Sequence, residues 1–293
     1  LGCTEPKLML EYLRGPASTE TQVIWGKDVP ITHYRQHRIS DRKSRLFACA
    51  CCRRLWHLLD EEHCHRLIDS ATEIGVFDRE ELPEPSADCC RTAIELAEQS
   101  ADEAVSEDEL YTLSRVAFAL NFAADNYCAS YCEEMGPFDN EFVAACQAAF
   151  AVNYACQYYT PEVTHFGVEK RGFDALAGVI FRSAMAVAWL QMPGYGSPEE
   201  GGDKQERAAH CGLLREIVGN PFRPVQFAPH WRTPNVVGIA NSIYEDRGFD
   251  RMPILADALM DAGCFDDEVL NHCRQPGEHV RGCWVVDLCL EKE

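Results

Sequence analysis

The spacing of the apolar residues is the feature that most constrains this chain, because it follows the three- and four-residue steps of an α-helix almost throughout. After Ser40 and Asp41, which are good N-cap residues, apolar side chains recur at these steps from Leu46 to Leu58. Further helices are expected at about 86–104, 106–134, 139–159, 173–191, 203–218, 234–247, 250–262, 266–274 and 283–291. No window shows convincing strand alternation. We therefore expect an all-α protein of stacked helical hairpins, either an irregular α-solenoid or a multi-helix bundle.

Helix start signals support two of these predictions. Ser106 and Glu109 have the spacing of an S-x-x-E capping box, in which each residue satisfies a backbone N–H of the other. Thr233 precedes Pro234, the pattern of an N-cap followed by proline at the first helical position.

Loop signals divide the predicted helices into two groups. Proline and glycine crowd the segment 192–202, which we predict to separate a helical domain at 1–191 from a C-terminal helical domain at 203–293. Proline and glycine also interrupt residues 16–39, which we predict to be a loop-like insertion. The second domain is expected to pack on the N-terminal helices as one unit.

The charge of the chain excludes one broad class of partner. It has 293 residues with 47 acidic and 27 basic side chains, giving a net charge of −20, so it lacks the surplus of cations that general nucleic-acid binding requires. No apolar run has the roughly 18 residues that a membrane span needs. A basic patch at 35–54 directly precedes the acidic stretch 61–110. We expect the two to pair internally or to form solvated helix faces; a docking surface for an acidic partner is the alternative.

Sixteen cysteines are too unevenly placed to form the disulfide framework of a secreted protein. No signal segment opens the sequence, and we expect a cytoplasmic protein whose thiols are reduced and mostly buried.

The C-x-x-C pattern of Cys49 and Cys52 is the first candidate metal site, with His57 five residues further on. A zinc ribbon needs a second cysteine pair, which is absent, although a C-terminal residue such as Cys273 could complete a site. On a helix, Cys49 and Cys52 share one face with Trp56, which is also the pattern of a buried core stripe. A buried core stripe explains these residues as well as a zinc site does. No metal is therefore predicted here, and zinc is kept as the alternative.

Two further pairs have metal-chelating spacing but a simpler explanation. His33 and His37 lie four residues apart in the predicted insertion, where we expect them to face solvent. Cys128 and Cys132 lie four residues apart on a predicted helix, where we expect them to be core residues.

Cys283 is the one candidate nucleophile, because a thiol at a helix N-terminus can have a lowered pKa. His279 and His272 are available bases, and Asp287 could orient one of them. Papain-type enzymes also place Cys-Trp at a helix start, but their histidine lies far downstream, whereas only ten residues follow Cys283. We therefore predict no catalytic residue. The common phosphate-loop and hydrolase motifs are also absent.

Several long motifs carry a resemblance to a known family. They are Ser40–Leu59, Gly219–Val225, Trp231–Thr233, Ile243–Arg247, Phe249–Leu259 and His279–Asp287. In these segments the chain resembles an expanded family of planctomycete proteins that has no assigned activity, while 76–204 matches it only loosely. The resemblance implies a bacterial cytoplasmic protein whose N-terminal and C-terminal segments belong to one conserved arrangement.

Together these observations predict a non-enzymatic helical module that serves as a scaffold or binds a protein partner. The tyrosine- and phenylalanine-rich middle helices are the expected place for a partner groove; their aromatic residues include Tyr127, Tyr131, Phe138, Tyr154, Tyr158 and Tyr159. The alternative is a zinc-binding or thiol-dependent protein whose site combines the Cys49–Cys52 helix with C-terminal cysteine and histidine residues. The sequence leaves the oligomeric state open.

Overall fold

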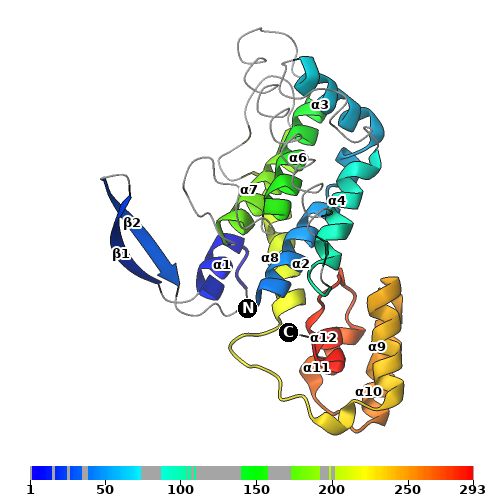
Figure 1. The fold of residues 1–293 in the computed structure, drawn as a ribbon. Helices are drawn as coiled ribbons and strands as arrows, with labels where there is room; N and C mark the ends of the chain where they lie inside the picture. Colours follow the sequence, from blue (N-terminus) through cyan, green and yellow to red (C-terminus); the bar gives the residue numbers. More distant parts are fainter. Residues whose placement is uncertain are drawn as a thin grey trace.

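The fold is described from a computed structural model, for residues 2–14, 17–24, 27–34, 39–73, 87–103, 105–106, 109, 140–157, 173–191, 198 and 202–292. These ranges contain eleven α-helices that pack mainly on one another (Figure 1). They are α1 (Pro6–Arg14), α2 (Asp41–Arg53), α3 (Glu61–Glu73), α4 (Ala87–Gln99), α6 (Asn140–Gln157), α7 (Phe173–Leu190), α8 (Lys204–Val218), α9 (Pro234–Asp246), α10 (Met252–Asp261), α11 (Asp267–Arg274) and α12 (Trp284–Leu290). Short 3₁₀ helices are η1 (Trp56–Leu58), η3 (Pro229–Trp231) and η4 (Phe249–Arg251). The prediction of an all-α fold is confirmed, with one local departure.

That departure is a β-hairpin inside the segment predicted as a loop-like insertion. Strands β1 (Ala17–Ile24) and β2 (Lys27–Tyr34) pair antiparallel, with Ala17 opposite Tyr34 and Ile24 opposite Lys27. The expectation of a loop was wrong for these residues. It gave more weight to proline and glycine than to the β-branched Thr, Val and Ile residues that favour extended backbone. Figure 1 shows the hairpin to one side of the helices.

The predicted helix caps are present. The side chains of Ser40 and Thr233 each accept a hydrogen bond from the backbone N–H three residues later. Ser106 and Glu109 hydrogen-bond reciprocally, as a capping box requires, with donor–acceptor distances of 3.0 and 3.2 Å. The signals at Ser40 and Thr233 therefore fix where α2 and α9 begin.

The core consists of two apolar clusters. The first surrounds α2, whose residues Leu46–Cys52 are all at most 3% exposed, and it includes residues of α1, α4, α6, α7 and α8. The second is formed by α9 to α12. The sequence grouped α8 with the C-terminal helices, but its Leu213, Leu214 and Ile217 belong to the first cluster. None of the described helices has the length and apolar character that crossing a bilayer requires.

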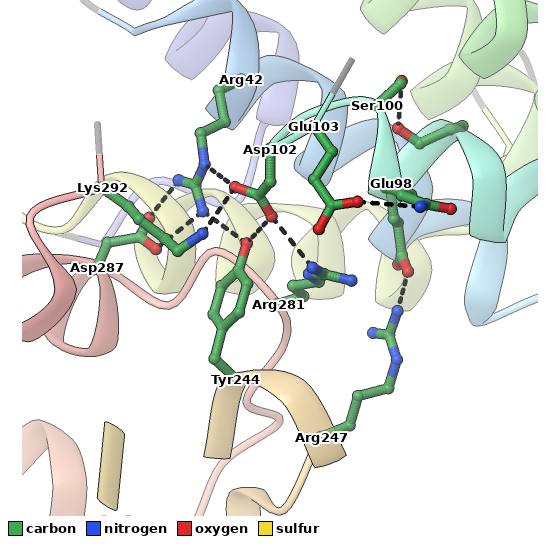
Figure 2. A network of polar contacts seen from close by, with 12 residues as sticks. Arg42, Glu98, Ser100, Asp102, Glu103, Tyr244, Arg247, Arg281, Asp287 and Lys292 are labelled. Atoms are coloured by element: carbon green, nitrogen blue, oxygen red, sulfur yellow. Dashed lines mark hydrogen bonds and ion pairs between the residues drawn. The ribbon is translucent and has the colours of Figure 1, made fainter. Parts of the chain in front are cut away.

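A buried polar network connects the N-terminal helix α2 to the C-terminal helix α12 (Figure 2). Arg42 donates hydrogen bonds to Asp287 at 2.8 and 3.1 Å and to Asp102 at 2.7 Å. Asp102 also accepts hydrogen bonds from Tyr244, Arg281 and Lys292. The network therefore joins α2 near the start of the chain, α12 near its end and the residues after α4.

The described part of the basic patch is largely paired within the molecule. Arg53 makes a bidentate pair with Glu98 at 2.6 and 2.7 Å, and Arg42 binds Asp102, so two arginines of the patch bind carboxylates of the acidic stretch. Arg54 pairs with Glu206 of α8 at 2.7 Å. These contacts support internal pairing. They occupy the guanidinium groups with which an acidic partner would have to pair.

The structure describes the side chains of thirteen cysteines, and none of these thirteen forms a disulfide. Twelve of them are buried. Their thiols occupy the apolar core, as small hydrophobic side chains do.

Protonation of Glu206 is expected to weaken the fold in acid. Burial alone would raise the pKa of Glu206, but hydrogen bonds from Arg54 and His210 outweigh burial and lower the pKa to about 2. A lowered folded-state pKa stabilises the fold above the unfolded value of 4.5, and this stability is lost as the pH falls toward 2. We expect a loss of about 2 kcal/mol between pH 7 and pH 3 from this group.

Urea unfolding of the wild type and of Glu206→Gln at the two pH values measures this loss. The difference in the free energy of unfolding between the two proteins should be about 2 kcal/mol smaller at pH 3 than at pH 7. A pH-independent difference would contradict the assignment, and Glu61→Gln, at an exposed position, is the control.

Candidate functional site

Four chemically different side chains meet between α8 and the C-terminal helices. They are Glu216, His272, His279 and Cys283, called here the four-residue group, and their potential ligand atoms all lie within 4.8 Å of one another. Glu216 and Cys283 are buried, and the two histidines are half-buried. Among the described residues, this is the group of histidine, cysteine and acidic side chains with the geometry to hold a metal ion.

The Glu216 carboxylate is the centre of the group. Its Oε1 lies 2.9 Å from His279 Nδ1, and its Oε2 lies 3.2 Å from His272 Nε2. His272 Nε2 also lies 3.2 Å from Cys283 Sγ. Each contact is within hydrogen-bond range, so the group is already assembled in the protein.

Local backbone features position these side chains. Glu216 lies in the last turn of α8, His272 lies in the last turn of α11, and Cys283 is the N-cap residue of α12. Gly282 has a φ of +94°, and a Cβ there would lie 2.9 Å from a side-chain carbon of Leu46. Only glycine allows the chain to pass this close to α2 while turning into α12.

The electrostatics of the group favour an ionised carboxylate beside a protonated thiol. Burial raises the pKa of Glu216, but hydrogen bonds from His272 and His279 outweigh it, and the net pKa is lowered. Burial raises the pKa of Cys283 well above the ordinary thiol value, and the negative charge of Glu216 raises it further. Cys283 is also fully buried. Because a nucleophile must be a thiolate that substrate can reach, the site does not support a nucleophilic Cys283.

Trp284 determines the position of the proton on His272. The indole Nε1–H of Trp284 donates to His272 Nδ1 at 3.1 Å, so a neutral His272 carries its proton on Nε2. That proton points to Glu216 and Cys283. Coordination of a metal by Nε2 would displace it, and the indole hydrogen bond must then weaken or break.

The donor set matches the ligands of zinc. Zinc binds thiolate sulfur, imidazole nitrogen and carboxylate oxygen, usually in a tetrahedron of four protein ligands at structural sites. Neighbouring ligand atoms of such a tetrahedron lie about 3.3–3.7 Å apart. The hydrogen-bonded pairs of the group need to separate by only a few tenths of an ångström to reach these values.

The structure brings together some of the candidates identified in the sequence and disperses the others. His279 and Cys283, with His272, belong to the four-residue group. The side chain of Asp287 does not orient either histidine and instead pairs with Arg42. Cys273, the neighbour of His272, packs into the second apolar cluster.

The structure does not bring together the ligands of the alternative zinc site in the Cys49 region. Cys49 and Cys52 are fully buried in the first apolar cluster, as the core-stripe interpretation predicted, whereas His57 is exposed in η1. The α2 side chain that lies against Gly282, next to Cys283 in the chain, is Leu46 and not a cysteine.

Several other predictions fall on residues outside the description. These are His37, Cys128, Cys132, Tyr127, Tyr131, Phe138, Tyr158 and Tyr159. The backbone of His33 is described in β2, and Tyr154 is half-buried against the first cluster.

Sequence reasoning missed Glu216. It lies in the last turn of α8, on the N-terminal side of the segment 219–231, whereas the other three members lie within one short stretch of the chain. No spacing rule links a glutamate to ligands so distant in sequence, and only the packing of α8 identifies it. Comparison with known proteins adds no ligand set, since no family model, no curated protein and no solved structure matches the chain.

Proposed function

We propose that this protein binds one zinc ion through the four-residue group and that the ion has a structural role. The observation that carries this proposal is the convergence of two imidazoles, a thiol and a carboxylate within 4.8 Å. Four protein ligands fill the tetrahedral coordination of zinc and leave no open position for a substrate, which is the arrangement of structural sites.

The charges of the site also suit a divalent cation. Glu216 supplies one negative charge, and Cys283 supplies a second when the metal displaces its proton. These charges balance those of Zn²⁺, so the metal-bound site is neutral. A neutral site avoids the cost of burying an unpaired charge.

The ion would connect the two apolar clusters. Glu216 belongs to α8, which packs in the first cluster, whereas Cys283 belongs to the second. Because the unfolded chain does not hold these ligands together, zinc binding would stabilise the contact between the clusters.

Zinc titration of chelator-treated, reduced protein tests the proposal. We expect one equivalent to bind and the free energy of unfolding to rise by about 2.7 kcal/mol when free zinc is 100 times the Kd. Cobalt(II) should give the visible bands of a tetrahedral site and a sulfur-to-cobalt band in the near ultraviolet. Trp284 fluorescence should change with the same stoichiometry, and Trp284→Phe identifies its contribution.

Two results would overturn the proposal. One is the absence of a stoichiometric zinc or cobalt complex in the folded, reduced protein. The other is a complex that forms equally well when His272 and His279 are both replaced by glutamine.

We also propose a role in binding a protein partner, on the basis of exposed apolar residues at the C-terminal end of the fold. Ile254 is 56% exposed, Met260 39% and Phe265 81%, and all lie in or just after α10. Ile254 lies in the first turn of α10, Met260 in its last turn and Phe265 four residues after its end. Single exposed apolar side chains are common, but three in one short stretch of chain form a candidate contact area. The cytoplasmic location and the planctomycete family remain predictions.

A further inference from the structure

A pocket of about 600 Å³ lies beside the four-residue group and shares only His272 with it. Its walls come from α1, from the end of α8 with the following segment 219–222, and from α11. His272 and Trp284 also line it. The volume falls within the range of about 300–1,000 Å³ that small-molecule sites occupy.

One part of the wall is aromatic and aliphatic. The rings of Tyr12 and Phe222 are in contact, with centroids 4.7 Å apart, and Phe222 is 69% exposed although it is a large apolar residue. Leu8 of α1, which is 58% exposed, extends this surface. Solvent-exposed apolar side chains that gather around a concave site are a feature of ligand pockets.

Gly219 allows Trp284 to form part of the wall. Its φ is +70° with a ψ of −151°, a region that is essentially restricted to glycine. A Cβ at this position would lie 3.2 Å from the indole ring of Trp284. The backbone after α8 can therefore lie directly against the indole.

The wall from α11 is polar. Asn271, in the last turn of α11, and Gln275, the C-cap residue of α11, lie on the face of the helix that lines the pocket, and both are exposed. Glu268 lies one turn earlier on that face, and Arg215 of α8 lines the pocket and donates to the Cys3 carbonyl. One negative and one positive side chain leave the lining without net charge, and the chain as a whole carries −20.

We propose that this pocket binds an uncharged, planar heteroaromatic ligand of the nucleobase or nucleoside type. Each carboxamide supplies both N–H donors and a C=O acceptor, which match the mixed donor and acceptor edge of a base. Tyr12 and Phe222 supply aromatic surface on which a planar ring stacks. The neutral lining and the negative chain disfavour phosphorylated forms.

Isothermal titration of the protein with adenosine, guanosine, cytidine and uridine tests this inference. We expect saturable binding of at least one nucleoside, weakened about tenfold or more in Asn271→Ala/Gln275→Ala and in Phe222→Ala. All three positions are exposed, so these variants should fold normally. Gln226→Ala, which removes an exposed carboxamide outside the pocket, should bind as the wild type does.

The inference is overturned if no nucleoside binds at millimolar concentration, if the Asn271→Ala/Gln275→Ala variant binds as tightly as the wild type, or if the 5′-triphosphate binds more tightly than its nucleoside. Equal binding of toluene and of nucleosides would show a pocket that recognises only apolar surface and would also contradict it. None of the three substituted residues is a proposed zinc ligand, so a negative zinc titration leaves this test unaffected.

Discussion

Replacing Cys283 by serine is expected to weaken zinc binding by more than about 100-fold, the upper end of the loss caused by mutating residues that only support a metal ligand. Serine keeps the size of the side chain but does not supply the thiolate that zinc prefers. The affinity is measured by competition with a chromophoric chelator of known zinc affinity.

Cys273→Ser is the matched control for this prediction. Cys273 is also buried, lies in α11 beside His272 and is outside the four-residue group. Both substitutions place a hydroxyl in the core, so a general loss of stability should affect them alike. Equal loss of zinc in the two variants, or loss in neither, would show that Cys283 is not a ligand.

Replacing Asp287 by alanine is expected to lower the free energy of unfolding by about 3–5 kcal/mol, because it leaves a buried arginine without its principal partner. The side chain of Asp287 is 1% exposed, and that of Arg42 is 12% exposed. Burial raises the pKa of Asp287, and the hydrogen bonds and positive charge of Arg42 oppose this shift. Urea unfolding measures the change.

Two further variants make this result specific to the buried pair. Asp257→Ala removes a carboxylate that is 75% exposed and paired with Arg274, and it should cost less than about 1 kcal/mol. The double variant Arg42→Met/Asp287→Leu removes both charges and should regain much of the lost stability. A cost for Asp287→Ala no larger than that of Asp257→Ala would contradict the assigned role of the network.

The cysteines and their neighbours show what can be predicted from the sequence and what cannot. The helical spacing of Cys49 and Cys52 correctly placed them in a core stripe, because the side on which a helical residue points depends only on its position in the helix. The same reasoning singled out Cys283 and His279, which are close in sequence. It assigned Asp287 to them as well, although the side chain of Asp287 pairs with Arg42 of α2.

The sequence by itself determined most of the described helices, although not α1 and α3, and the cap hydrogen bonds of Ser40, Ser106 and Thr233, because apolar spacing and side-chain hydrogen bonds act over a few residues. Only the tertiary structure decided which side chains meet. Glu216 reaches His272, His279 and Cys283 because α8 packs beside the C-terminal helices and Gly282 turns the chain into α12. Such contacts depend on the sum of long-range packing, which no local pattern of residues encodes.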